Sequence, residues 1–449
     1  MGKVRDLTEG NVGRQIFSFS IPIMFGALFQ QFYNVVDTAI VGKILGVEAL
    51  AAVGATGSVM FLILGFCNGL GAGFAIPIAQ KFGAKDEVGV RRTFANCIWL
   101  GIIMSVLLTV VTTLECNNIL SIMDTPDNIV GMSYSYLFII FLGIPVTFFY
   151  NMLSGILRAL GDSKTPLYFL IFSSLLNIGL DIECIKYLGW GTAGAAIATV
   201  AAQLVAGVMC AVYMRSKYPI LHMEREDRRF DAEKIKLLLS AGVPMGLQYS
   251  ITAIGSILLQ TAVNGLGSDY VASMTSGGKI SMFVICPFDA LGTALATFTG
   301  QNVGARKLDR VDEGLKQAII GGTIYSIVSF VFLYIFGDEL ALIFVDKSQE
   351  VIIHNIHVFL ICNAASYLFL LGVNTFRFVI QGMGYSVLAV TSGVMEMLAR
   401  GLMGVFIVPK LGFIFACFAS PLAWVFACAF LIPAYLSVRK KMRVKYQII

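Results

Sequence analysis

Charged side chains are scarce in this 449-residue sequence: they make up 13% of it, whereas ordinary soluble domains carry about 25%. Apolar and aromatic residues account for 57%. A water-soluble globule has too little interior to bury that much apolar surface, so a soluble fold is excluded. The sequence also lacks a Walker nucleotide-binding sequence, a serine nucleophile elbow and an HExxH zinc motif, and so gives no support for nucleotide-driven or hydrolytic chemistry.

Long apolar stretches recur along the whole chain, and each can cross a hydrocarbon core of about 30 Å as a helix. Runs of this length exclude a β-barrel. Two stretches exceed thirty residues and contain Pro77 and Pro287, so we expect tilted or broken helices there. The twelve predicted spans are 15–41, 49–80, 93–114, 129–157, 165–182, 187–214, 237–266, 270–301, 317–337, 353–376, 386–408 and 411–438.

The basic residues predict the orientation. Twenty-six of the 32 lysines and arginines, including Lys3, Arg5 and Arg377, fall in the ends and every second connection between spans, as the positive-inside rule requires of cytoplasmic segments. Both termini are therefore expected in the cytoplasm. The net charge of +5 is spread over these loops, which gives no indication of nucleic-acid binding.

The sequence contains an internal repeat. LGAGFAIPIAQKFGAKD at 70–86 matches LGTALATFTGQNVGARK at 291–307 at an offset of 221, and RALGDS at 158–163 matches QGMGYS at 381–386 at an offset of 223. We therefore predict an all-α integral membrane protein with twelve transmembrane helices, arranged as two six-helix bundles related by a pseudo-twofold along the membrane normal. The expected boundaries are 1–215 for the first bundle, 216–236 for a charged cytoplasmic linker and 237–449 for the second bundle.

Polar residues inside the spans are costly and therefore mark candidate functional positions. In the first span Gln30, Tyr33, Asn34 and Asp37 share one helical face, which we expect to point inward. Asp37 has no cation on its own helix. A buried carboxylate of this kind can be neutralised alternately by a proton, a metal cation or a cationic substrate, which is the chemistry of an ion-coupling site. A carboxyl satisfied by neighbouring hydroxyls, with no function, is the alternative.

The fifth span carries a second polar face with Asn177 and Asp181. Asp181 is either an interfacial charge or, with Asp37, part of an oxygen-rich site suited to Na⁺. Asn151 and Thr199 are candidates for further oxygen ligands. Asp289 occupies the repeat position of Asn68. The candidate substrate-binding residues are Gln30, Tyr33 and Asn34 of the first span and Asn68, Gln248 and Asp289 of other spans. Glu396 and Arg400 have the spacing of a helical ion pair, whereas Lys279 either lines a cleft or meets another helix.

Four segments together resemble one known family. They are IPIMFGALFQQFYNVVDTAIVGKILGVEALAAVGATGS, LRALGDSKTP, LNIGLDIE and ALATFTGQNVGARK, and they resemble the hallmarks of the multidrug and toxic-compound extrusion (MATE) family, closest to its bacterial members. The resemblance covers the whole chain. It implies export of cationic, amphipathic compounds in exchange for H⁺ or Na⁺, with coupling in the first half at positions matching Asp37, Asn151, Asn177, Asp181 and Thr199. Some family members also use a glutamate in the seventh span, where this chain has none.

The sequence thus predicts a secondary antiporter, not an enzyme, in the cytoplasmic membrane of a bacterium. We expect a monomer with no prosthetic cofactor, whose partners are small organic cations and the lipid bilayer. A flippase for lipid-linked oligosaccharides, which would need a cationic cavity for pyrophosphate, is the main alternative. A membrane-embedded enzyme would need a clustered catalytic constellation, and the sequence offers no such cluster.

Overall fold

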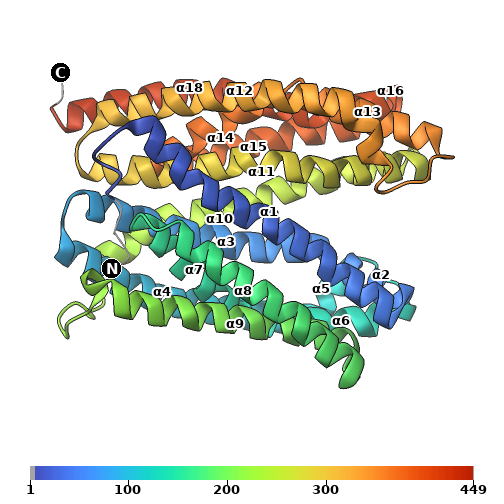
Figure 1. Ribbon diagram of the computed structural model, residues 1–449, viewed down its shortest axis with the longest axis horizontal. Helices are drawn as coiled ribbons and strands as arrows, with labels where there is room; N and C mark the ends of the chain where they lie inside the picture. The colour runs from blue at the N-terminus through green and yellow to red at the C-terminus, as the bar shows by residue number, and fades with distance from the viewer. Residues whose placement is uncertain (1–5, 448–449) are drawn as a thin grey trace. The chain divides into compact units, whose positions relative to one another are not determined.

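The computed structural model describes residues 6–447, and within them the chain is almost entirely helical (Figure 1). Lys3 and Arg5, which contribute to the predicted orientation, lie outside the described residues. The first half contains α1 (Val12–Leu45), α2 (Val47–Ala55), α3 (Gly57–Gly83), α4 (Glu87–Leu114), α5 (Cys116–Ile122), α6 (Asp127–Leu142), α7 (Ile144–Ala159), α8 (Lys164–Asp181) with a π-helical turn (Ile182–Tyr187), and α9 (Gly191–Lys217).

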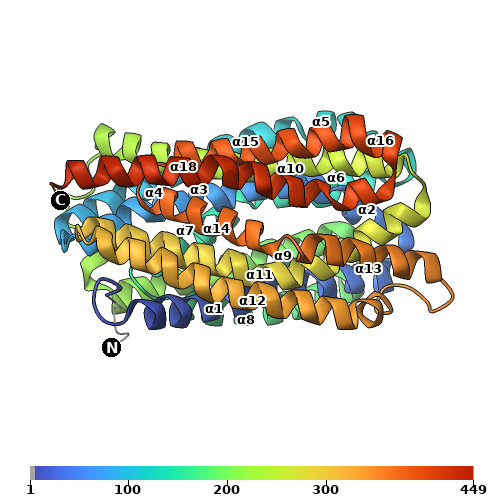
Figure 2. The ribbon, with the colours of Figure 1, turned by 90° about the horizontal axis from the view of Figure 1, so that it is seen from above.

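A short 3₁₀ turn (Pro219–Leu221) lies within the predicted linker and precedes the helices of the second half. The second half contains α10 (Ala232–Asn264), α11 (Ser268–Gly304), α12 (Leu308–Ala341), α13 (Glu350–Ala364), α14 (Tyr367–Gly382), α15 (Ser386–Leu402) with a π-helical turn (Met403–Ile407), α16 (Val408–Leu411), α17 (Phe413–Cys417) and α18 (Ala419–Lys445). Figure 2 shows α11 and α12 running side by side.

The helices account for the twelve predicted spans. Among residues 6–447, nine helices are long and apolar enough to cross a membrane, and two bent pairs, α6 with α7 (49°) and α13 with α14 (48°), bring the number to eleven. The remaining predicted span, 386–408, corresponds to α15 with the π-helical turn that follows it. The all-helical membrane fold predicted from the sequence is confirmed.

The long helices are not broken at the two prolines where the sequence led us to expect tilted or broken helices. Pro77 and Pro287 lie inside the continuous helices α3 and α11. The stretch 49–80 is broken at Thr56, between α2 and α3, so the expectation of a break there was right but its cause was wrong. A long membrane helix tolerates an internal proline when neighbouring groups satisfy the freed carbonyl. The sequence did not predict the bend after α6, where Pro145 in the first turn of α7 cannot supply the N–H that would continue the helix.

The repeat is visible in the backbone as well as in the sequence. Lys85 and Arg306, which are 221 positions apart, are both left-handed, with φ of 57° and 59°. Non-glycine residues rarely adopt this conformation, so its recurrence at equivalent positions indicates the same turn in both halves. The matching glycine pairs with positive φ are Gly46 and Gly267, and Gly161 and Gly384.

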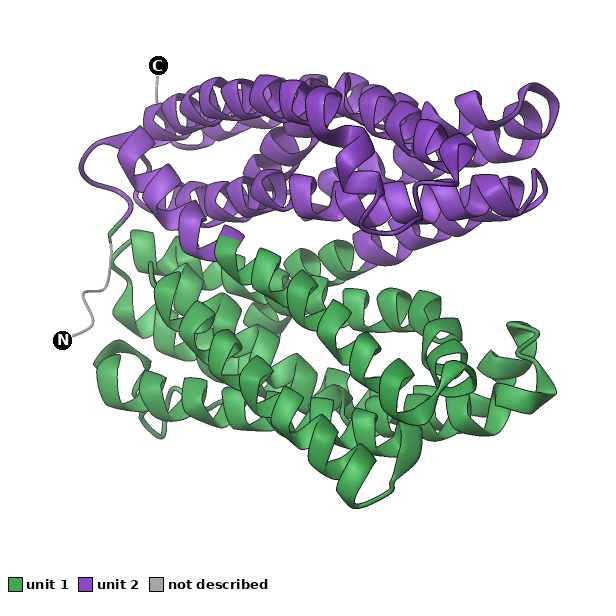
Figure 3. Ribbon diagram, turned by 45° about the vertical axis from the view of Figure 1, so that its right-hand side comes forward, with its two compact units in different colours: residues 1–6, 25–246 green, residues 7–24, 247–449 purple. Residues whose placement is uncertain are grey.

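The chain forms two compact units that do not coincide with its two halves (Figure 3). Unit 1 comprises residues 1–6 and 25–246, and unit 2 comprises 7–24 and 247–449. The beginning of α1 therefore belongs to unit 2, and the beginning of α10 belongs to unit 1. The predicted domain boundaries at 215 and 237 describe the repeat along the chain and remain a prediction.

Within unit 2, the segment before α1 is held by polar contacts. The Leu7 N–H donates to Gln301 Oε1 at 2.9 Å, Lys307 Nζ donates to the Thr8 carbonyl at 2.9 Å, and Arg310 Nη1 donates to the Gly10 carbonyl at 2.9 Å. Leu7 is 1% exposed. These contacts fix the position at which α1 begins.

Within unit 1, the segment before α10 is held in a similar way against α4. Asp227 is buried and pairs with Arg91 Nε at 3.0 Å and with Arg92 Nε at 3.4 Å. The Asn96 amide donates to the Arg229 carbonyl at 3.2 Å, and its oxygen accepts from the Asp231 N–H at 2.9 Å. These contacts hold residues 222–231 against α4, and we call this segment the strap.

Asp227 should control how well this strap is held. Burial alone would raise its pKa, but the Glu224 N–H and the guanidinium groups of Arg91 and Arg92 outweigh burial and lower the pKa. The carboxylate therefore stabilises the strap fully above the unfolded pKa of about 3.9, and this contribution is lost as the pH falls below that value. At neutral pH, Asp227→Asn should expose the strap's arginines and speed trypsin cleavage there by about tenfold or more.

The matched control is Glu224→Gln, because the Glu224 side chain is exposed and its backbone N–H would be retained. Cleavage should stay at the wild-type rate in this variant. Equal acceleration in both variants would show that the loss of one negative charge, and not the loss of the pairing, loosens the strap.

A close backbone approach between α3 and α10 within unit 1 requires glycine. A Cβ built on Gly73 would lie 2.5 Å from Gly242 Cα, a distance at which the backbones must separate. We expect Gly73→Ala to destabilise the protein by about 1–3 kcal/mol, measured by thermal unfolding in detergent. Gly131→Ala in α6 is the control, since its Cβ meets nothing within 4 Å. It should be neutral or slightly stabilising, and equal destabilisation by the two changes would refute the packing argument.

Candidate functional site

Two buried acids meet inside unit 1. Asp37 of α1 is 9% exposed and Asp181, the last residue of α8, is fully buried. Their carboxyl groups contact each other, and neither Asp37 Oδ1 nor Asp181 Oδ1 has a hydrogen-bond donor among the described residues. Two bare carboxylates repel at this range, so a shared proton or a bound cation must accompany the pair.

Neutral oxygen and nitrogen groups surround the acids. With the Asn177 amide oriented to satisfy both of its groups, its nitrogen donates to Asp181 Oδ2 at 2.9 Å and its oxygen accepts from the Thr199 N–H at 3.1 Å. The Tyr33 hydroxyl bonds with the Thr199 side chain. Asp37, Tyr33, Asn177, Asp181 and Thr199 therefore form one cluster, contributed by α1, α8 and α9.

The local backbone at Asp181 is unusual. The regular helix α8 ends at Asp181 and continues as the π-helical turn Ile182–Tyr187. Such turns in otherwise regular helices are found frequently at functional sites, because they redirect side chains that a regular helix would place elsewhere. Of the two alternatives left open for Asp181, the structure shows the contact with Asp37, and Asp181 is not an exposed interfacial charge.

Tyr136 of α6 is a member of the cluster that the sequence analysis missed. It is 4% exposed and lies within electrostatic range of Asp37, Asp181 and Tyr33. One tyrosine among the many aromatic residues of the spans gives no signal in the sequence. Only the fold identifies it.

Several predicted site residues do not join the cluster. The Asn151 side chain donates to the Thr147 carbonyl in its own helix at 2.9 Å. Gln30, Asn34 and Asn68 are exposed. Four residues of the first helix were predicted to share an inward face, and only Tyr33 and Asp37 belong to the cluster.

Unit 2 contains separate polar contacts. Gln381 Nε2 donates to Gln248 Oε1 at 2.8 Å in a buried position, and Asn374 Nδ2 donates to Asp289 Oδ1 at 3.2 Å. Asp289 itself is exposed. The Lys279 ammonium group lies 5.9 Å from the ring centroid of Phe344, in the turn that follows α12.

The predicted pair of Glu396 and Arg400 exists, with Arg400 Nη2 at 3.3 Å from Glu396 Oε2, but it has a third member. Arg377 was predicted to lie in a cytoplasmic loop, and this was wrong: it lies in α14, is 6% exposed and bonds both Glu396 and Ser392 Oγ. Burial is tolerated because the acid on α15 neutralises it. We call Arg377, Glu396 and Arg400 the charge triad.

The charge triad is not balanced. Two guanidinium groups share one carboxylate, and Arg400 Nη1 is buried with no partner among the described residues. Removal of Arg400 would leave Arg377 and Glu396 as a neutral pair.

The chain has twelve predicted spans in two repeats, and one unit contains a buried pair of acids without a basic partner among the described residues. These are the features of a secondary transporter. The MatE family model matches residues 22–182 and 244–406. The "Probable multidrug resistance protein YoeA" of Bacillus subtilis is 30% identical over 368 residues, which cover 80% of this chain and 79% of that protein. The "Probable multidrug resistance protein YpnP" of the same organism is 29% identical over 350 residues, which cover 78% of each chain.

A solved structure supports the same fold. An outward-facing multidrug resistance MATE family transporter of the MOP superfamily superimposes with a TM-score of 0.89 at 24% sequence identity, covering 99% of both chains. The chain belongs to the MatE family, and it is a transporter and not an enzyme.

The charge triad allows an ordered stability prediction. Glu396→Gln leaves two buried arginines without an acid and should cost about 3–5 kcal/mol, whereas Arg400→Leu leaves the Arg377–Glu396 pair intact and should cost much less. Thermal unfolding in detergent measures both variants. If Arg400→Leu were the more damaging change, Arg400 and not Arg377 would be the main partner of Glu396.

Proposed function

We propose that this protein exports lipophilic organic cations across the cytoplasmic membrane of a bacterium in exchange for H⁺ or Na⁺, and that the coupling ion acts at Asp37 and Asp181. The observation that carries the proposal is the contact between these two buried carboxyls, each of which has one oxygen, Oδ1, without a donor among the described residues. The names of the YoeA and YpnP relatives support drug-like substrates.

The cluster is suited to a proton or to Na⁺. Its ligand atoms would be the carboxylate oxygens of Asp37 and Asp181 with the hydroxyl oxygens of Thr199 and Tyr33, and hard cations prefer such oxygens. Asn177 would position Asp181 through its amide nitrogen. Loss of the bound ion leaves two like charges in contact. The pair then regains stability by taking up a new cation, which links ion release to the rest of the cycle.

The driving force follows from the charges exchanged. Exchange of one proton for one monovalent organic cation moves no net charge, so a pH gradient of one unit would supply about 1.4 kcal/mol. We propose further that both termini face the cytoplasm, on the basis of the basic loops, and that the protein acts as a monomer.

A flippase for lipid-linked oligosaccharides is disfavoured. Its pyrophosphate would need a surplus of positive charge, whereas the buried cluster within the spans of unit 1 is built on two acids, Asp37 and Asp181. The charge triad of unit 2 carries a surplus cation but all three members are buried.

The test is dye export from proteoliposomes in which pH and Na⁺ gradients are imposed separately. Asp37→Asn should lower ion-driven export at least about tenfold, because the variant cannot release and rebind a proton or hold Na⁺ in the same way. Asp181→Asn should weaken the ion dependence, and whichever gradient drives the wild type identifies the coupling ion.

Asp124→Asn is the matched control, because Asp124 belongs to unit 1, is exposed and has a left-handed φ of 50° that asparagine tolerates. Its export should equal that of the wild type. Full ion-driven export by Asp37→Asn would remove Asp37 from the mechanism, and an unaltered ion requirement in Asp181→Asn would remove Asp181 from the site.

A further inference from the structure

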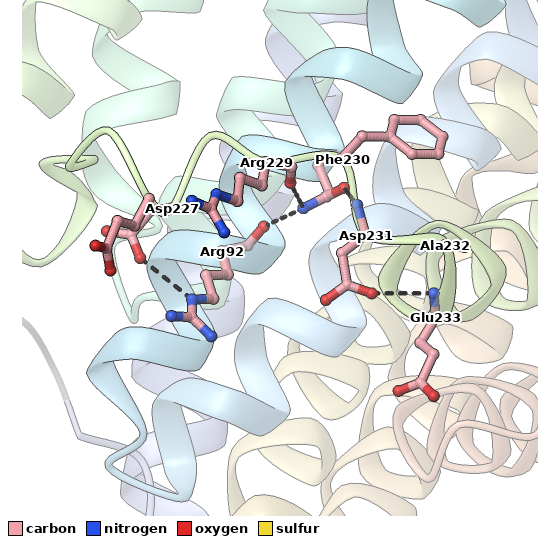
Figure 4. A pocket seen from close by; sticks show the side chains of 9 residues that line it. Arg92, Asp227, Arg229, Phe230, Asp231, Ala232 and Glu233 are labelled. Atoms are coloured by element: carbon pink, nitrogen blue, oxygen red, sulfur yellow. Dashed lines mark hydrogen bonds and ion pairs between the residues drawn. The ribbon is translucent and has the colours of Figure 1, made fainter.

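The strap and α4 border an open pocket that the proposed transport mechanism does not use. The pocket has a volume of about 510 Å³ and lies within unit 1 (Figure 4). Arg92 and Asn96 of α4 form one side of it. The strap and the first turn of α10 form the other side, with Glu226, Arg229 and Phe230 from the strap and Glu233 from α10.

The position of the pocket relative to the bilayer follows from α4. Exposed apolar residues repeat along one face of this helix with helical spacing, as expected of a surface in contact with lipid. We call this face the α4 stripe, and its members are Trp99, Ile102, Ile103, Val106, Leu107, Val110 and Val111.

The α4 stripe begins beside the pocket. Trp99 is its first member, and the Trp99 indole N–H donates to the Arg228 carbonyl of the strap at 3.1 Å. Tryptophan with a bonded N–H and an exposed ring is typical of the membrane–water interface. Phe230, which lines the pocket, is 62% exposed. The pocket therefore lies at the level of lipid headgroups, at the end of a surface that lipid chains cover.

The charges in the pocket have a defined pattern. Asp227 is already occupied by Arg91 and Arg92. The guanidinium of Arg229, in contrast, has no hydrogen bond or ion pair with any residue from 6 to 447, although its backbone carbonyl is held by Asn96. The side-chain carboxylates of Glu226 and Glu233 are also without partners in this part of the chain. One cation and two anions are therefore free to bind a ligand.

We propose that this pocket binds the phosphoethanolamine headgroup of a membrane phospholipid. The phosphate bonds the Arg229 guanidinium, which presents its N–H groups in a geometry suited to phosphate oxygens. The primary ammonium group donates to Glu226 and Glu233, and the acyl chains lie along the α4 stripe. A phosphocholine headgroup lacks ammonium N–H donors, and a phosphoglycerol headgroup lacks the cation, so each satisfies only one half of the pocket.

Native mass spectrometry of the full chain in detergent can measure this selectivity. The probes are phosphatidylethanolamine, phosphatidylcholine and phosphatidylglycerol with identical acyl chains, titrated separately. Phosphatidylethanolamine should bind about tenfold more tightly than either of the others, because it alone makes both sets of charge-assisted hydrogen bonds. Equal binding of the three lipids by the wild type would overturn the proposal.

Arg229→Ala should weaken the binding of all three lipids by about tenfold, because the phosphate that Arg229 bonds is common to them, and Arg228→Ala is its matched control. Both changes remove one positive charge from adjacent exposed positions, but Arg228 does not line the pocket and contacts Trp99 only through its backbone carbonyl. An equal loss in the two variants would indicate general charge attraction to lipid and would contradict a specific headgroup site.

The acidic side has its own test. A Glu226→Gln, Glu233→Gln double variant should bind phosphatidylglycerol as tightly as phosphatidylethanolamine, since the groups that select an ammonium are gone. Retention of the full preference by this variant would refute the assigned roles of the two acids. Resistance of the strap to trypsin, measured on the same samples, separates a loss of the lipid contact from a loss of the strap itself.

Discussion

The cost of an unbalanced charge inside a membrane protein determines the polar architecture of both units. In unit 1, Asp37 and Asp181 contact each other, and no basic residue from 6 to 447 pairs with either, so their charge depends on what they bind. In unit 2, Glu396 is held permanently by two arginines. The first arrangement can exchange its counter-ion with the surroundings, whereas the second is closed. The acids of the two repeats thus differ, because those of unit 1 have no permanent counter-ion whereas Glu396 of unit 2 has two.

Outside the spans, buried charged and polar groups are paired with fixed partners in the protein. Asp227 is buried in the strap but faces Arg91 and Arg92, and the segment from Leu7 to Gly10 is held by side chains of α11 and α12. These contacts fix where α10 and α1 begin. The side chains of Arg229, Glu226 and Glu233, in contrast, have no partner among the described residues and line the pocket, so they are available to a ligand.

Much of the fold could be predicted from the sequence, because a membrane helix must be long and apolar throughout and such runs are plain to see. The acid cluster was also predictable in part, since Asp37 and Asp181 are costly residues in apolar spans. Arg377 was misplaced because a charged residue near the end of an apolar run is indistinguishable from a loop residue until its partner on another helix is known. Tyr136 and the exposure of Asn34 depend on tertiary packing, and no spacing rule within one helix contains that information.

The contact between Leu7 and Gln301 also constrains how the protein is made. The two residues are 294 positions apart, so at about 5–20 residues per second the ribosome needs roughly 15–60 s to supply the partner of a segment that emerged first. During that interval the start of α1, which belongs to unit 2, has no unit 2 to join. The order of synthesis therefore places the last step of assembly at the first helix, and biogenesis of this membrane protein should be most vulnerable there.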